Sequence, residues 1–424
     1  MSSKGNATDI NDGDQPTVLP KLRFPAFREA RGWESATLEE IAEFVREKIP
    51  VGLIDLENYI STENILVDYG GVTRAAKMPS AGSVTTFRLN DTLVSNIRPY
   101  LRKVWFADRD GGASNDVIVI RAKRKLLTQY FPHLLKNDSF IEYVMTGAKG
   151  VKMPRGDVAS IKGYPTSYPT RPEQQKIADC LSSVDELIAA QTRKGDALKT
   201  HKKGLMLQLF PREGEAQPRL RFSEFRNARE WQEQKISALL VKSVSPVDVD
   251  LSTTYQEIGI RSHGKGIFHK ELISGKALGE KKVFWVEENA FVLNIVFAWE
   301  QAVAVTSATE KGMIASHRFP MFTARKNKAD VEFIKYFFLT KRGKELLGIA
   351  SPGGAGRNKT LGQKEFENLE ILLPSTLEEQ IEIAGLLSSI DLLIRIQVRE
   401  LEVLKTYKKG LMQQLFPSPE DVAA

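Results

Sequence analysis

The residue types that most often catalyse reactions or bind metals are sparse in this chain. Only His263 and His269 lie near each other among the five histidines, which are His133, His201, His263, His269 and His317. We interpret that pair as surface residues of a hairpin. The sequence also lacks the H-E-x-x-H and G-x-S-x-G patterns of metalloproteases and hydrolases. It therefore predicts no catalytic residue and no metal ligand in this chain.

One glycine-rich segment approaches a phosphate-binding motif. Residues 353–360 read GGAGRNKT, whereas the G-x-x-x-x-G-K-[ST] motif requires a glycine where Asn358 stands. The corresponding segment in the first half, TGAKGVKMPRGD at residues 146–157, shares only glycines and basic residues with it. We interpret both segments as small, flexible, positive loops. Such loops suit DNA phosphates and guanine edges, although an ordinary solvated loop has the same composition.

Length and composition favour a globular protein with two large domains. The chain has 424 residues, of which 42% are hydrophobic, and no apolar run is long enough to span a membrane. Its first residues are polar and resemble no signal peptide, so we expect a cytoplasmic protein. The single cysteine, Cys180, excludes a disulfide framework, and we expect it to be a small buried residue.

The net charge of +7 is mildly basic, with 60 lysines and arginines against 53 aspartates and glutamates. The excess is spread over two large segments. This distribution fits a pair of domains that face nucleic acid and are joined by nearly neutral elements. Many domains that bind no nucleic acid share so small a bias.

A repeat covers nearly the whole chain. EQQKIADCLSSVDELIAAQTRKGDALKTHKKGLMLQLFP, from Glu173, aligns without a gap with EQIEIAGLLSSIDLLIRIQVRELEVLKTYKKGLMQQLFP, from Glu379. Ahead of each copy, PKLRFPAFREARGWE matches PRLRFSEFRNAREWQ and pairs Trp33 with Trp231. We infer a duplication with the following boundaries: a tail at 1–20, a domain at 21–170, a long helix at 171–211, a second domain at 212–377, a second long helix at 378–417, and a tail at 418–424.

The two repeated segments are predicted to be long amphipathic helices that pair. Capping boxes at Thr170 with Glu173 and at Thr376 with Glu379 begin them, and Pro211 and Pro417 end them. Apolar residues at alternating spacings of four and three predict a coiled-coil seam. The seam positions are Ile177, Leu181, Val184, Ile188, Gln191, Leu198 and Leu205 in the first helix, and Ile383, Leu387, Ile390, Ile394, Gln397, Leu404 and Leu411 in the second.

We expect the two helices to pack antiparallel, because a whole domain separates them in the sequence. About forty residues at 1.5 Å each give a rod of roughly 60 Å. Gln191 and Gln397 lie at identical seam positions near its middle, so we predict that they lie close to each other. A polar seam residue can fix the register, although a glutamine tolerated at a loose crossing explains the pair equally well.

The two large segments mix strand and helix signals, and the predicted fold class is therefore α+β. In the first segment TLEEIAEFV predicts a short helix, DTLVSNI and NDVIVIRAK predict strands, and YFPHLLKNDSFIEYVM predicts a helix. In the second, YQEIGIRSHGKGIFHKELI predicts a hairpin about Gly264 and Gly266. FVLNIVFA predicts a buried strand, and VEFIKYFFLTKRGKELLGIA predicts a helix.

Taken together, the two LRFxxF…W openings, the two EQ helix starts and the two KKGLM-x-QLFP helix ends resemble the specificity subunits of type I restriction-modification systems. The resemblance spans roughly residues 20–417. It implies a non-catalytic subunit that reads DNA, with two target recognition domains, each binding one half of a bipartite sequence, and with the helix pair as the spacer. The resemblance also implies two methyltransferase subunits that bind S-adenosylmethionine, and restriction subunits that use ATP and magnesium. No cofactor is expected in this chain.

The candidate DNA contacts are basic residues of predicted loops and turns. They are Arg74, Lys77, Arg98, Arg102, Lys152 and Arg155 in the first domain, and Arg261, His263, Lys265, Arg318, Arg357 and Lys359 in the second. For each one, an ordinary solvated charge is the competing interpretation. Two other functions also remain open: a coiled-coil scaffold that organises protein partners without reading DNA, and a self-contained nuclease or methyltransferase, whose carboxylate cluster or cofactor loop is absent from the sequence.

Overall fold

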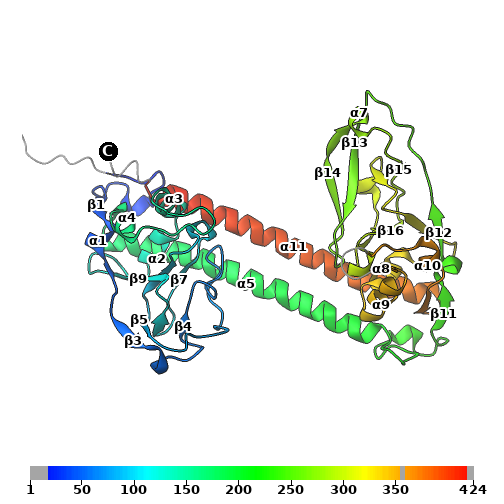
Figure 1. Ribbon diagram of the computed structural model, residues 1–424, viewed down its shortest axis with the longest axis horizontal. Coiled ribbons are helices and arrows are strands. Elements are labelled where there is room, and N and C mark those ends of the chain that lie inside the picture. The colour runs from blue at the N-terminus through cyan, green and yellow to red at the C-terminus, as the bar shows by residue number, and fades with distance from the viewer. Residues whose placement is uncertain (1–17, 354–358, 418–424) are drawn as a thin grey trace, which may run out of the picture. The chain divides into compact units, whose positions relative to one another are not determined.

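The computed structural model describes residues 18–353 and 359–417 (Figure 1). The chain divides into two compact units, Met1–Gln191 with Glu400–Ala424, and Thr192–Arg399. Each unit holds one α+β domain, the beginning of the long helix that follows this domain, and the end of the other long helix. The predicted fold class is therefore confirmed.

The domain of the first unit precedes helix α5. Its strands are β1 (Glu34–Thr37), β2 (Ala42–Phe44), β3 (Lys48–Pro50), β4 (Tyr59–Ile60), β5 (Ser83–Phe87), β6 (Thr92–Ser95), β7 (Val104–Phe106), β8 (Gly111–Ala113), β9 (Val117–Ala122) and β10 (Pro165–Tyr168). Its helices are α1 (Leu38–Ile41), α2 (Phe131–Leu135), α3 (Asp138–Thr146) and α4 (Val158–Lys162), with 3₁₀ helices η1 (Pro25–Phe27), η2 (Val51–Leu53) and η3 (Pro99–Leu101).

The domain of the second unit lies between the two long helices in the sequence. Its strands are β11 (Gln232–Lys235), β12 (Leu240–Ser243), β13 (Thr254–Ile260), β14 (Ile267–Ser274), β15 (Val283–Trp285), β16 (Phe291–Leu293), β17 (Val303–Val305), β18 (Ile314–Ser316), β19 (Met321–Ala324) and β20 (Glu370–Leu373). Its helices are α6 (Ile236–Leu239), α7 (Gly275–Leu278), α8 (Val331–Phe338), α9 (Lys341–Ile349) and α10 (Gln363–Glu367), with 3₁₀ helices η4 (Ser223–Phe225), η5 (Ala298–Glu300) and η6 (Ala308–Glu310).

The sheets of the two domains are similar but not identical. The first domain has four-stranded sheets ordered β2-β9-β6-β7 and β3-β5-β8-β4, and the second has β12-β19-β16-β17 and β14-β13-β18-β15. A small antiparallel pair, β1-β10 or β11-β20, accompanies them in each domain. Each domain also contains one parallel pairing, β4 with β8 or β13 with β18. The parallel pair lies at the edge of its sheet in the first domain, whereas β14 flanks it in the second domain. The shared order of the β2-β9-β6-β7 and β12-β19-β16-β17 sheets is the structural counterpart of the sequence repeat.

Several local predictions need correction. The segment predicted as one late helix is two helices in each domain, because a capping residue interrupts it. Asn137 caps α3 by accepting a hydrogen bond from the Ser139 N–H, and Thr340 caps α9 by accepting one from the Gly343 N–H. The predicted helix TLEEIAEFV also ends early, since its second half forms β2. The hairpin predicted about Gly264 and Gly266 is confirmed as β13 and β14.

The two long helices, α5 (Arg171–Leu209) and α11 (Leu377–Leu415), run antiparallel in each unit. In the first unit Asp185 pairs with Lys408 at 2.6 Å, and in the second Asp391 pairs with Lys202 at 2.6 Å. The seam is most deeply buried where a domain covers it, at Ile177, Leu181, Val184, Ile383, Leu387 and Ile390. Seam positions nearer the middle, such as Leu198 and Leu404, are half-buried.

The two glutamines predicted to lie together belong to different units. In the first unit Gln191 hydrogen-bonds to Glu400, and in the second unit the buried Gln397 packs beside Gly195. Their proximity therefore stays a prediction.

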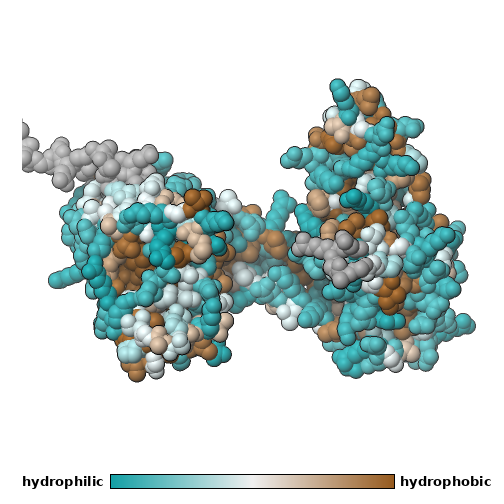
Figure 2. All heavy atoms as spheres, viewed as in Figure 1, coloured by the Kyte–Doolittle hydropathy of each residue, from teal (hydrophilic) through white to brown (hydrophobic). Residues whose placement is uncertain are grey.

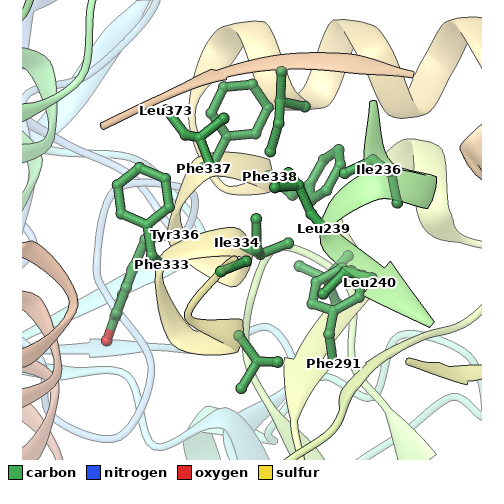
Figure 3. Close-up of a cluster of buried hydrophobic side chains, with 14 of the residues drawn as sticks. Ile236, Leu239, Leu240, Phe291, Phe333, Ile334, Tyr336, Phe337, Phe338 and Leu373 are labelled. Carbon is green, nitrogen blue, oxygen red and sulfur yellow. The ribbon is translucent and has the colours of Figure 1, made fainter. Parts of the chain in front are cut away.

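Each domain closes its core around the ends of both helices. In the first, the core contains Trp33 together with Ile177 of α5 and Leu415 of α11, and Trp33 meets Phe416 edge to face with ring centres 6.4 Å apart. The second domain repeats this arrangement with Trp231 and Phe210, 6.3 Å apart. Its core also gathers Phe291, Ile334, Tyr336 and neighbouring aromatic residues (Figure 3). These contacts explain why the tryptophan and the QLFP ending occur twice in the sequence.

The glutamate at each helix start is not used as the capping-box prediction proposed. Arg23 donates two hydrogen bonds of 2.8 Å to the Glu173 carboxylate, and the Trp33 Nε1–H donates a third, of 3.4 Å. The second unit repeats this contact around Glu379 with arginine distances of 2.7 Å and a tryptophan distance of 3.2 Å. A buried carboxylate needs such partners. The contact therefore fixes each domain opening to the helix that follows it.

The glutamine that follows each of these glutamates contacts the backbone just before the helix α2 or α8 of its domain. The Gln174 side-chain oxygen accepts a hydrogen bond of 2.7 Å from the Leu127 N–H, just before α2. The Gln380 oxygen accepts one of 3.0 Å from the Asp330 N–H, just before α8. The repeated EQ pair therefore positions the domain on its helix.

Candidate nucleic-acid interface

Over residues 18–353 and 359–417 no group of three or more histidine, cysteine, aspartate or glutamate residues is placed to hold a metal ion. In the same residues no helix has the length and apolar character needed to cross a bilayer. The visible face of each unit is largely hydrophilic, with hydrophobic patches between the polar side chains (Figure 2).

A turn at the end of the central strand carries the first candidate contacts. In the first domain β6 leads to Arg98, which precedes η3, and Arg102 follows η3; both have a left-handed backbone with φ of 52°. Left-handed backbone is uncommon for arginine, and such residues cluster at binding sites. The Arg98 side chain is exposed, and the backbone N–H of Arg98 donates to the Pro154 carbonyl at 2.8 Å. This bond ties the turn to the glycine-rich loop.

The glycine-rich loop of the first domain is a finger that backbone hydrogen bonds close at its base. Lys149 and Arg155 exchange two backbone hydrogen bonds of 2.9 Å and form its base. At its tip, Lys152 is flanked by Val151, which is 99% exposed, and Met153, which is 56% exposed. Exposed apolar side chains beside a lysine suit the thymine methyl groups and sugar faces of a DNA groove. Sequence reasoning had selected only the basic residues here, although apolar residues in so short a turn were a usable signal.

The other candidates of the first domain already have acidic partners. Arg74 lies 3.8 Å from Glu57 and Lys77 lies 3.7 Å from Glu63, all four being well exposed. Exposed pairs at these distances are weak and leave both cations accessible.

Arg102 is more firmly held than these two. It contacts Asp138 at 2.9 Å and Asp68 at 3.5 Å, and it lines a hollow of about 450 Å³ with the exposed Tyr100. Arg155 is also paired, with Asp116 at 2.8 Å. Arg98 and Lys152 are therefore the candidates of this domain without an acidic partner among the described residues.

A further cation of this turn was missed by the sequence reasoning. The Lys103 ammonium donates to the Thr62 carbonyl at 2.6 Å. Burial and the nearby charge of Arg98 lower the pKa of Lys103. The two cations raise the local positive potential, which favours a polyanion.

The second domain presents its candidates on the turn between β13 and β14. Arg261, His263 and Lys265 are all exposed, and the Arg261 guanidinium lies 4.8 Å from the ring centre of Phe268. The turn is attached to η5, because the His263 N–H donates to the Glu300 carbonyl at 2.8 Å.

Of the remaining candidates, Lys359 lies beside the same 3₁₀ helix, η5, and Arg318 contacts the segment that precedes this helix. The carbonyl of the exposed Arg318 accepts from the Ile295 N–H at 3.0 Å, and the Lys359 ammonium lies 5.7 Å from the Trp299 ring. Arg357 lies outside the described residues. The structure thus places Arg261, His263 and Lys265 on one turn attached to η5, and it places Lys359 beside Trp299 of the same 3₁₀ helix. Arg74 and Lys77 in the first domain lie on a separate loop.

Solved structures share this architecture. A type I restriction-modification S subunit from M. genitalium matches with a TM-score of 0.59 and 14% identity, covering 94% of this chain and 99% of that chain. A chain from a structure described as showing complex assembly and conformational transition of the type I restriction-modification system matches with a TM-score of 0.52 and 16% identity, covering 92% and 98%. The chain therefore has the fold of these structures, with two domains and two long helices.

Sequence comparisons identify the family. The model of the type I restriction modification DNA specificity domain matches residues 30–200 and 261–406, more than half of the chain. The chain is also 23% identical over 417 residues to the type I restriction enzyme MjaVIII specificity subunit of Methanocaldococcus jannaschii, covering 90% of this chain and 92% of that protein. The chain belongs to the type I restriction modification DNA specificity domain family, and it is a specificity subunit rather than a catalytic one.

Proposed function

We propose that each recognition domain reads one half of a bipartite DNA target and that the two long helices set the interval between the halves. The observation that carries this proposal is the construction of each unit, in which one domain closes over the beginning of one helix and the end of the other. Two equivalent bodies on two shared helices suit two separate contacts on one duplex.

The unlike surfaces of the two domains favour a target whose halves differ. The first domain offers Arg98 and Lys152 beside an apolar finger tip, whereas the second offers Arg261 and Lys265 on a hairpin turn. Arginine and lysine side chains that reach base edges prefer guanine, and apolar tips prefer thymine methyl groups. Similar folds with different contacts therefore predict an asymmetric sequence.

The partners of this chain follow from its class. We infer that two modification subunits dock against the helices and recognition domains and bring S-adenosylmethionine, and that restriction subunits bring ATP and magnesium. This chain contributes DNA reading alone and binds none of these cofactors, and we place the assembly in the cytoplasm. The exposed apolar residues of α11, including Leu392, Ile396 and Tyr407, offer surface for such docking.

The test is selection of DNA by the assembled complex. The chain, combined with its modification subunits, is incubated with duplexes of random sequence, and the retained or methylated DNA is sequenced. We expect a single motif of two different half-sites separated by a gap of fixed length and free sequence. Retention without any sequence motif would support the alternative, a scaffold that organises protein partners.

Two single substitutions assign the halves in the same assay. Arg98→Gln should relax the motif in one half only, and Arg261→Gln should relax it in the other half only. Loss of a base-reading arginine costs about 1–3 kcal/mol at one base pair, whereas loss of a phosphate contact weakens binding to all sequences. A uniform loss for either variant would assign that arginine to the DNA backbone.

A further inference from the structure

In both domains a loop is fastened to the 3₁₀ helix by the same backbone contact. In the second domain the N–H groups of His263 and Gly264 donate to the carbonyls of Glu300 and Gln301, at 2.8 Å and 3.0 Å. In the first domain Asp68 and Tyr69 donate to Leu101 and Arg102 in the same way, both at 3.0 Å. We call these two consecutive donors and their two acceptors the latch.

The latch requires an unusual backbone at the donors. The φ angles are 60° and 63° at His263 and Gly264, and 51° and 61° at Asp68 and Tyr69. Left-handed backbone is unfavourable for residues with a side chain, so it persists only where surrounding contacts enforce it. Because the sequences His-Gly and Asp-Tyr have nothing in common, the geometry has been kept while the residues changed.

The second domain adds side-chain contacts that hold the latch in place. The Ser262 hydroxyl donates to the Glu300 carboxylate at 2.9 Å, and the Gln301 side-chain nitrogen donates to the carbonyls of Phe338 and Thr340, at 2.9 Å and 3.2 Å. Gly264 packs so closely on Leu339 that a Cβ atom would lie 2.5 Å from the Leu339 Cδ2. The end of the hairpin that carries this turn lies toward α8 and α9 (Figure 1).

The two latched loops carry different charges. In the second domain the exposed Arg261 and Lys265 flank the latch. In the first domain the latch contains Asp68, which lies 3.5 Å from Arg102 and offsets its charge. The free cations of the first domain, Arg98 and Lys152, lie outside the latched loop.

We propose that the latch positions the turn Arg261–Gly266 as the reading element of the second domain, with Gly264 as a positioning residue for one half-site. The first domain reads from its finger and from Arg98 instead. This inference rests on the proposed function. A side chain that reads a base edge must be held to within a fraction of an ångström of its binding position. The backbone hydrogen bonds of the latch and the packing of Gly264 on Leu339 hold the turn with this rigidity.

The test uses Gly264→Ala in the chain assembled with its modification subunits, again with random duplexes. The added methyl group meets Leu339 and displaces the turn, so we expect preference at one half-site to fall at least tenfold while the other half-site is unchanged. The matched control is Gly312→Ala, which also has a left-handed φ, of 82°, but meets no atom within 4 Å. The control variant should retain its sequence preference at both half-sites.

Rescue separates positioning from simple loss of structure. Tyr69 shows that a side chain is tolerated at the equivalent backbone geometry, so the clash with Leu339 is the expected cause of failure. Gly264→Ala combined with Leu339→Ala should therefore recover most of the lost selectivity. If the Gly264→Ala variant does not assemble, the Gln301→Gly variant provides a second test. It removes the side chain that anchors the latch and leaves the left-handed backbone accessible. It should weaken the sequence preference at the same half-site.

The outcomes are distinct for the two proposals. A wild-type complex that selects no sequence overturns the proposed function. A selective wild-type complex whose Gly264→Ala and Gln301→Gly variants keep both half-sites overturns the latch while the proposed function stands. Equal losses at both half-sites, with a lowered melting temperature, would likewise reduce the latch to a structural role.

Discussion

His133 and Tyr336 occupy equivalent places beneath the paired helices, but only Tyr336 is satisfied there. The Tyr336 hydroxyl donates to Asp391 at 2.7 Å, and Asp391 also binds Lys202. In the first unit Asp185 binds Lys408 in the same way, yet the Nδ1 atom of His133 has no hydrogen-bond partner among the described residues. Burial, assisted by the charges of Lys136 and Lys408, lowers the pKa of His133 well below its usual value.

This histidine should make the stability of the first unit depend on pH. An unfolded histidine takes up a proton near pH 6.5, whereas the buried His133 stays neutral, so the unfolded state binds more protons and acidification favours it. Between pH 6.5 and the lowered pKa, the free energy of unfolding should fall by up to about 1.4 kcal/mol per pH unit. Above pH 6.5 this loss of stability does not occur, because the histidine is then neutral in both the folded and the unfolded state.

The variant His133→Tyr isolates this effect, because it copies the arrangement of the second unit. Denaturant unfolding of both proteins at a series of pH values between 7.5 and 5 should show a shallower pH dependence for the variant. Parallel curves for the two proteins would show that His133 does not titrate on unfolding.

At the scale of elements, the glycines of the long helices differ in what surrounds them. Gly195 lies in the middle of α5, and a Cβ atom there would meet only the Gln397 Cβ, at 3.9 Å, which is an ordinary contact. Alanine is the better helix former. Gly195→Ala should therefore stabilise the protein by about 0.5–1 kcal/mol, measured by denaturant unfolding.

For a glycine in a shorter helix we predict the opposite effect on stability when it is replaced by alanine. At Gly343 of α9 a Cβ atom would lie 2.2 Å from the Phe337 carbonyl oxygen, which is backbone and cannot move aside cheaply. Gly343→Ala should lower the melting temperature. Equal effects of the two substitutions would mean that helix propensity outweighs packing at both sites.

The elements that the sequence predicted well are those whose signal is repeated or periodic. The long helices, the α+β class and the β13–β14 hairpin follow from spacing and from the duplicated segments, and the structure contains all three. Helix breaks at Asn137 and Thr340 were missed because apolar spacing continues across them, and a capping hydrogen bond is a contact that periodicity does not reveal.

The candidate site was predictable only as a set of residue types. Basic residues in loops were identifiable, but their separation into free cations such as Arg98 and paired ones such as Arg102 depends on acidic neighbours distant in sequence. The latch was invisible, since His263-Gly264 and Asp68-Tyr69 share a backbone geometry and no residue type. The Glu173 and Glu379 carboxylates were assigned to capping because their partners, Arg23 and Arg221, lie some 150 residues away in the chain.

At the scale of the whole molecule, the duplication makes each domain depend on both helices. Neither long helix belongs to one unit, because α5 begins in the first and ends in the second, while α11 does the reverse. The repeated tryptophan, EQ pair and QLFP ending are the contacts that fix these ends to the domains. A change in the length of both helices should therefore leave each domain intact.

Helix extension tests the central claim most directly. Seven residues that continue the seam are inserted between Gln191 and Thr192 in α5 and between Arg399 and Glu400 in α11, adding two turns or about 10 Å to each. At roughly 3.4 Å per base pair this corresponds to about three base pairs. Sequencing of DNA methylated by the assembled complex should show both half-sites unchanged and the gap between them longer by about three base pairs. An unaltered gap in an active complex would contradict the claim that the helix pair sets the interval.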